Sequence, residues 1–267
     1  MRHLFVSDLH LDGSSPATVE AFLRFLSTAA RDATSLHILG DLFETWIGDD
    51  DPDPVRDRIC LALRALGESG VAIFVMQGNR DFLYGREFER RSGCVLLPDP
   101  VVLDLFGERV LLTHGDLLCT GDHAYQELRS TMRSAGFRER VLALPIDARQ
   151  LLASAARAGS KAHLRATAAD IMDVAPEAVT AAFIASGTRK MIHGHTHRPN
   201  HHKHVLHVDD AECTAERIVL AAWDERGEYL EVVLREGASM PEWRRCAVEI
   251  ALNLANRSEN ETPDRVR

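Results

Sequence analysis

The sequence predicts an α/β fold that carries an inserted helical segment, and three observations favour this class. Short apolar runs rich in β-branched residues recur along the chain and end in polar residues, which is typical of buried strands. Amphipathic helical patterns lie between the early runs, as in layered α/β proteins. Residues 117–175 show helical patterns and no convincing strand, so we expect a helical cap inserted between core segments 1–116 and 176–240.

The individual elements follow from these patterns. Two helices are predicted over residues 18–30 and 54–66, because apolar side chains recur there on one broad face. The predicted strands are short apolar runs, and they cover residues 4–6, 36–39, 71–76, 101–105, 110–112, 190–192, 218–222 and 230–234. The polar segment 256–267 is expected to be disordered.

Composition narrows the class of protein. The 267 residues suit one large domain or a domain with an insert, and the net charge of -9 argues against a general nucleic-acid binder. Five cysteines without closely spaced pairs predict no disulfide framework and favour a reducing compartment. The sequence starts without a signal peptide, and no run reaches the roughly 18 apolar residues of a membrane span. We therefore expect a cytoplasmic protein, which can still touch a membrane surface.

Ligand-type side chains follow five of the predicted strands. In open α/β sheets such loops gather at the carboxyl edge, where active sites form. An Asp-x-His or His-x-His pair in an extended segment places both side chains on one face, so that each pair can bind one metal or lie across two. Adjacent glycines permit tight turns. The sequence therefore predicts a metal site, with the ligands Asp8, His10, Asp41, Asn79, His114, His195 and His197.

This mixture of carboxylate, imidazole and amide groups suits a borderline divalent ion such as Mn, Fe or Zn, and no thiolate set favours a structural zinc. Two further clusters allow alternatives. The acidic run 49–51 could rim the site or lie in an outer shell, but we favour a solvated loop. His201, His202, His204 and His207 could form a second metal site, but we favour an exposed loop.

The five motifs, Asp-x-His, Gly-Asp, Gly-Asn-x-Asp, His-Gly-Asp and Gly-His-Thr-His, resemble the calcineurin-like metallophosphoesterase superfamily. This resemblance implies a four-layer αββα sandwich and two divalent ions, most simply Mn²⁺, bridged by Asp41. It implies that Asp8, His10 and His197 complete the coordination of one ion. Asn79, His114 and His195 would complete the coordination of the other.

Longer strings, FVSDLHL, ILGDLFETWIGDDDP, GNRDFL, THGDLLCTGDHAYQ and IHGHTHRP, resemble the UDP-2,3-diacylglucosamine hydrolase family over about residues 2–234. The resemblance implies hydrolysis of that nucleotide-activated glycolipid to UMP and 2,3-diacylglucosamine 1-phosphate (lipid X) in lipid A biosynthesis. It also implies peripheral association with the cytoplasmic face of the inner membrane, and no nucleic-acid partner. The alternatives are another metallophosphoesterase, such as a phosphodiesterase or general phosphatase, and a non-catalytic metal-binding scaffold.

Arg80 separates this chain from the wider superfamily, which usually has histidine at that motif position. An arginine stays protonated at neutral pH and cannot donate a proton, but its planar fork can bind phosphate oxygens. That exchange suits a pyrophosphate, because a departing sugar phosphate needs charge stabilisation more than a proton. We therefore expect Arg80 and His195 to stabilise developing charge, and Asp41 to matter most among the ligands.

The resemblance also implies residues that bind the substrate. Asn79, Arg80 and His195 would contact it from the core. The cap would add Asp122, Tyr125, Arg157 and Ser160, which are all present. Two positions depart from the family pattern: Leu164 replaces an Asn and Thr167 replaces a Lys, and nearby Lys161, His163 and Arg165 are expected to compensate. The acyl chains need an apolar cleft, for which Leu142, Leu144, Ile146, Leu151 and Leu152 are candidates, unless they form the cap's own core.

Overall fold

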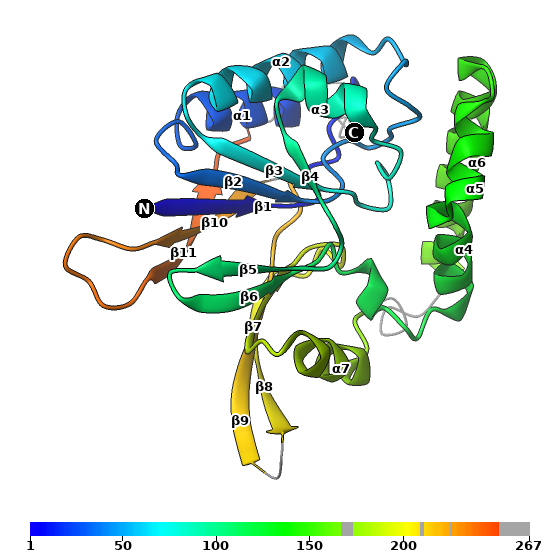
Figure 1. The fold of residues 1–267 in the computed structure, drawn as a ribbon. Coiled ribbons are helices and arrows are strands. Elements are labelled where there is room, and N and C mark those ends of the chain that lie inside the picture. Colours follow the sequence, from blue (N-terminus) through cyan, green and yellow to red (C-terminus); the bar gives the residue numbers. More distant parts are fainter. Residues whose placement is uncertain (167–172, 209–210, 225, 251–267) are drawn as a thin grey trace, which may run out of the picture.

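The computed structural model describes residues 1–166, 173–208, 211–224 and 226–250, with the backbone alone over residues 161–166. It has an α/β fold with two mixed sheets, as the sequence predicted (Figure 1). No helix within the described ranges combines the length and the apolar character needed to cross a bilayer. All five cysteines are free thiols, which agrees with the predicted absence of a disulfide framework.

The first sheet has six strands in the order β11-β10-β1-β2-β3-β4. Strands β1 to β4 run parallel, and β10 pairs antiparallel with both β1 and β11. Strand β11 lies beyond residue 240, where the predicted core ended. The strand bounds are Arg2–Val6 for β1, Ser35–Leu39 for β2, Ala72–Met76 for β3, Val95–Leu97 for β4, Gly227–Val233 for β10 and Glu242–Val248 for β11.

The second sheet has five strands in the order β5-β6-β7-β9-β8. Strands β6, β7 and β9 run parallel, whereas β5 and β8 pair antiparallel at the two edges. The bounds are Val101–Leu105 for β5, Glu108–Leu112 for β6, Lys190–His193 for β7, Asn200–Val208 for β8 and Ala211–Val219 for β9.

Two predictions about this sheet were wrong. The histidine run was expected to be an exposed loop, but it forms β8, which pairs with β9 over its whole length. The predicted strand 218–222 overlaps only the end of β9. The Leu220 amide still donates to the carbonyl of His193, as the last bond of the parallel ladder with β7. Beyond it the chain leaves the sheet, because the Trp223 amide donates to the carbonyl of Asp8 and holds this segment at the loop after β1.

Helices cover the sheets, and three apolar cores hold the layers together. One core lies between the first sheet and helices α1 to α3, a second between the two sheets, and a third between the second sheet and α7. Helices α1 and α2 both begin with a proline, and the Asp53 carboxylate caps α2. The bounds are Pro16–Ser27 for α1, Pro54–Glu68 for α2, Arg86–Ser92 for α3 and Pro176–Ser186 for α7.

The segment predicted as a cap is helical. It contains α4, α5 and α6, which stand beside the sheets as a separate column in Figure 1. Arginines tie this column to the core. Arg133 donates to the carbonyl of Gly78 at 2.9 Å, and Arg149 donates to the carbonyl of Ile47 at 2.7 Å. The bounds are Asp116–Leu118 for the short 3₁₀ helix η1, His123–Arg133 for α4, Ala135–Leu142 for α5 and Ile146–Ala166 for α6.

The acidic run 49–51 is not the solvated loop that we favoured, because each carboxylate has partners within the protein. Asp49 accepts hydrogen bonds from the first backbone amides of α3, Asp50 pairs with Arg149 of α6, and Asp51 pairs with Arg56. These bonds fix the loop after β2 to helices α2, α3 and α6.

Candidate metal centre and active site

The loops that carry the predicted ligands meet at one edge of the two sheets. Backbone hydrogen bonds join them directly: the Asp8 amide donates to the carbonyl of Gly40, and the Gly194 amide donates to that of His114. The His195 amide donates to the Asp8 carboxylate at 2.8 Å. The site is therefore assembled across both sheets and does not depend on a single flexible loop.

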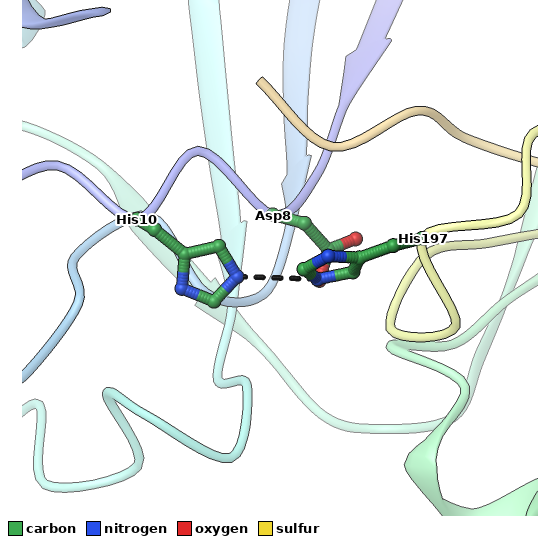
Figure 2. A group of neighbouring side chains, drawn as sticks. All are labelled: Asp8, His10 and His197. Atoms are coloured by element: carbon green, nitrogen blue, oxygen red, sulfur yellow. Dashed lines mark hydrogen bonds and ion pairs between the residues drawn. The ribbon is translucent and has the colours of Figure 1, made fainter. Parts of the chain in front are cut away.

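One group of ligands consists of Asp8, His10 and His197, drawn in Figure 2. The Nε2 atoms of His10 and His197 lie 3.3 Å apart and point toward one another, and His197 Nε2 is 3.5 Å from Asp8 Oδ1. Asp8 Oδ1 is buried and accepts no hydrogen bond from the described residues. A buried carboxylate oxygen left without a donor, facing two imidazole nitrogens, is the arrangement that a divalent cation would satisfy.

The second group consists of Asn79, His114 and His195. Asn79 Oδ1 lies 3.0 Å from His114 Nε2 and 3.1 Å from His195 Nδ1, so an amide oxygen and two imidazole nitrogens converge. His114 is fully buried, and its Nδ1 bonds the carbonyl of Leu39 at 2.9 Å. That second bond fixes the ring so that Nε2 faces the group, which is how outer partners orient metal-binding histidines.

Asp41 lies between the two groups. Its Oδ2 is 3.9 Å from His10 Nε2 and its Oδ1 is 3.9 Å from His114 Nε2. The carboxylate thus directs one oxygen toward each group, as a bridging ligand must. Oδ1 also accepts a hydrogen bond from the Arg80 amide at 2.8 Å, which ties the bridge to the loop after β3.

The backbone at the ligands is held in the sparsely populated left-handed region. Five of the seven candidate ligands have positive φ angles, namely Asp8 at 54°, His10 at 49°, Asp41 at 51°, His195 at 67° and His197 at 54°. Such conformations cost of order 1–3 kcal/mol each and gather at functional sites. Gly78 and Gly194 allow this crowding, because a Cβ on either one would overlap the carboxylate of Asp41 or Asp8.

Three carboxylates that support the ligands were not predicted as site residues. Glu44 Oε2 lies 3.0 Å from His10 Nδ1, and buried Asp81 accepts a hydrogen bond from the Gly78 amide at 2.8 Å. Asp116 accepts hydrogen bonds from Tyr125 at 2.9 Å and Arg129 at 2.7 Å, both on α4, so it connects the site to that helix. The available signal was their spacing, since each lies two or three positions after a ligand.

The electrostatics of the group favour charged forms at some histidines and neutral forms at others. Burial lowers the pKa of His10 and of His114, but neighbouring carboxylates raise both values to about 9. At His10 these carboxylates are Glu44, Asp41 and Asp8. At His114 they are Asp41, Asp116 and Asp8. Burial and the charge of His114 lower the pKa of His195 to about 4. Burial alone would raise the pKa of Asp8, but His197 and His114 hold it below its ordinary value.

Metal affinity should therefore depend on pH. Below about pH 9 the metal-free site holds protons on His10 and His114, and an incoming ion must displace both. We expect the affinity for Mn²⁺ to rise between about pH 6 and pH 9, by up to about 100-fold per pH unit where two protons leave. Calorimetry in buffers of different ionisation enthalpy would count the protons released. An affinity that does not change with pH would show that these histidines are not ligands.

A cavity of about 560 Å³ lies between helices α4 to α6 and the loops after β2 and β3. Asn79 and Arg80 form part of its wall, so it opens from the second ligand group. The Arg80 Nε atom is buried and has no hydrogen-bond partner among the described residues. The rest of the wall is largely apolar and includes Phe82, Leu83, Leu128, Met132, Phe137, Val141 and Leu152.

The predicted substrate-binding residues divide into three sets. Asn79, Arg80, Tyr125, Arg157 and Ser160 line this cavity, and the ring of His195 stacks on Tyr125 with centroids 5.9 Å apart. Asp122 is buried and caps α4 by accepting a hydrogen bond from the Tyr125 amide. The two departing positions lie outside the described part of the chain: Thr167 entirely, and Leu164 in its side chain. The same holds for the side chains expected to compensate, those of Lys161, His163 and Arg165.

Most of the predicted acyl cleft lies elsewhere. Only Leu152 of that set lines the cavity, and Leu142, Leu144 and Leu151 are exposed by 40%, 38% and 73%. The apolar wall comes instead from α4, α5 and the loop after β3. The site therefore joins two groups of metal-type ligands, a buried guanidinium nitrogen that has no partner in the described part of the chain, and an apolar cavity.

Comparisons with known proteins agree with this arrangement. A model of the calcineurin-like phosphoesterase family matches residues 1–199. Similar curated proteins include UDP-2,3-diacylglucosamine hydrolases from Stenotrophomonas maltophilia strain R551-3, 48% identical over 87% of this chain and 95% of its own length, and from Xanthomonas axonopodis pv. citri, 47% identical over 90% and 98%. Another, from Pseudomonas paraeruginosa, is 49% identical over 87% and 95%.

Proposed function

The chain belongs to the calcineurin-like phosphoesterase family and within it to the UDP-2,3-diacylglucosamine hydrolases, and we propose that it hydrolyses the pyrophosphate bond of UDP-2,3-diacylglucosamine by means of two divalent ions. The products are UMP and 2,3-diacylglucosamine 1-phosphate, a step of lipid A biosynthesis. The observation that carries the proposal is the apolar cavity that opens from Asn79 of the second ligand group, next to the two groups that Asp41 joins.

The residues present fit two ions. Asp8, His10 and His197 would hold one, and Asn79, His114 and His195 the other, with Asp41 between them. Oxygen and imidazole ligands without thiolates suit Mn²⁺, which we propose as the native ion. When bound, the ions would polarise the phosphoryl oxygens and acidify water to a hydroxide nucleophile.

The chain's own residues would then position the pyrophosphate. Arg80 would place its guanidinium against the phosphoryl oxygens and stabilise the charge that grows on the departing sugar phosphate. His195 is buried, with a pKa of about 4, so at neutral pH it is an uncharged imidazole that can bind an ion or donate a hydrogen bond. Tyr125 and Arg157 would orient the glucosamine phosphate from the cap side of the cavity.

The apolar wall would hold the acyl chains. Leu128 on α4 lines the cavity and is 54% exposed, so a charge at this position would enter the space that the chains need. We expect Leu128→Glu to lower kcat/KM for the lipid substrate by about 100-fold or more, because binding of the acyl chain would remove water from the new carboxylate without giving it a partner. A small soluble diester such as bis-p-nitrophenyl phosphate should lose far less.

The matched control is Leu61→Glu on α2, an exposed leucine that does not line the cavity. It should leave the ratio of the two activities unchanged. If Leu128→Glu lowered both activities equally, the cavity would not be the acyl site. Preference of the parent enzyme for the small diester would instead support a phosphodiesterase, the second function that the ligand set allows.

Two finer aspects of the architecture belong to the same proposal. We propose that the core is the four-layer αββα sandwich, formed by residues 1–116 and 176–240 together with β11, and that residues 117–175 are an inserted cap. The three apolar cores between successive layers support this division. The enzyme would meet its substrate at the cytoplasmic face of the inner membrane. Exposed Leu144, Leu151 and Leu152 on and beside α6 support a peripheral contact there.

A further inference from the structure

A second cavity opens at His10 of the first ligand group and adjoins the apolar cavity at Glu44 and Arg157. It has a volume of about 490 Å³, within the range of pockets that hold small molecules. Its wall is polar, in contrast to the apolar cavity, and consists of His10, Asp12, Ser14, Ser15, Glu44, Ser154, Arg157 and Ala158. It lies between the loop that precedes α1 and the cap helix α6.

The two cavities meet at the ligand groups. Glu44 and Arg157 line both, His10 lines only the polar one, and Asn79 and Arg80 line only the apolar one. A substrate whose pyrophosphate lies at the ligand groups can therefore extend in two directions, toward apolar walls or toward hydroxyl and carboxylate groups. The substrate of the proposed function has two ends of just these kinds, a diacyl sugar and a uridine.

We infer that the polar cavity binds the uridine end and that Asp12 binds the ribose hydroxyls, an inference that rests on the proposed function. Ribose hydroxyls donate hydrogen bonds that a carboxylate accepts, the contact by which an acidic residue recognises ribose in dinucleotide-binding folds. Ser14, Ser15 and Ser154 supply hydroxyls that can both donate to and accept from the uracil edge and the ribose.

Asp12 is held ready for this role. Its Oδ1 accepts hydrogen bonds from the Ser14 amide at 2.8 Å, the Ser14 hydroxyl at 2.7 Å and the Ser15 hydroxyl at 3.3 Å. All three bonds end on one oxygen, which leaves Oδ2 without a hydrogen bond from the described residues. The negative charge of Asp12 repels the pyrophosphate of the substrate. Hydrogen bonds that the ribose hydroxyls donate to Oδ2 would offset this repulsion.

The test compares UMP with 2′-deoxy-UMP as product inhibitors of the Mn²⁺-loaded enzyme, in the parent and in Asp12→Asn. Asparagine keeps one carbonyl oxygen for the turn and replaces the second oxygen by a donor. We expect the parent to bind UMP at least about 10-fold more tightly than 2′-deoxy-UMP, as for a hydrogen bond to a charged group. Asp12→Asn should lose most of this preference and raise KM for the lipid substrate.

The matched control is Asp32→Asn, an exposed aspartate away from both cavities, which should keep the preference of the parent. If Asp12→Asn kept the full preference, or if the parent showed none, the ribose would not lie at Asp12 and the inference would be overturned. These outcomes are separate from the proposed function, because the function fails only if the parent does not hydrolyse UDP-2,3-diacylglucosamine at all.

Discussion

Asp41→Ala is expected to remove both metal ions together and to lower kcat/KM by roughly 1000-fold or more, because the charge of both ions acts on the reacting phosphoryl group. The reason is its position: one carboxylate oxygen is 3.9 Å from His10 and the other is 3.9 Å from His114. Calorimetric titration with Mn²⁺ should find the stoichiometry of the parent near two and that of Asp41→Ala near zero.

His197→Ala is the comparison variant, because His197 belongs to one ligand group only. It should weaken the binding of one ion and leave the binding of the other unchanged. Circular dichroism should show both variants folded, since the three apolar cores do not include these residues. Near-normal turnover by a folded Asp41→Ala would show that the carboxylate does not bridge two ions.

Arg80→Ala should lower kcat by about 100- to 1000-fold, the usual cost of removing a preorganised group that stabilises transition-state charge. The guanidinium lies at the mouth of the apolar cavity, and its buried Nε has no partner among the described residues, which leaves it available for the substrate. Arg80→Lys should recover part of the loss, because it restores the charge without the bidentate geometry.

The control for this prediction is Arg31→Ala, which removes an exposed arginine outside the site. Substrates with different leaving groups separate the two roles considered for this position. If Arg80 stabilises charge, the loss in the alanine variant should be largest for phosphate leaving groups. A loss that is largest for poor alcohol leaving groups would point to proton donation and contradict the proposed role.

The sequence was most informative where residues of one functional group are close neighbours along the chain. The candidate metal ligands occur in pairs or beside glycine after apolar strands, so their convergence followed from the rule that parallel strands end at one edge. The strands with apolar runs could be predicted because their buried residues are neighbours in the sequence. Strand β8 was missed because its alternating histidines resemble a polar loop, and β11 because an edge strand rich in Glu and Arg carries no buried run.

The remaining features depend on contacts between distant segments. The apolar wall uses Leu128 and Phe137 rather than Leu142 and Leu151, and helix periodicity alone does not say which face of a cap helix meets the core. The link from Asp116 to Arg129 joins segments that the sequence separates, and so does the polar cavity between the loop before α1 and α6. Such features require the tertiary structure.

Metal-dependent hydrolysis is tested by measuring release of UMP from UDP-2,3-diacylglucosamine by the purified protein, before and after removal of divalent ions by chelation. We expect turnover with Mn²⁺, none after exhaustive chelation, and recovery on adding Mn²⁺ that exceeds recovery with Mg²⁺, because imidazole ligands suit the softer ion. Undiminished UMP release from the metal-free protein, or no release with Mn²⁺ present, would contradict this expectation.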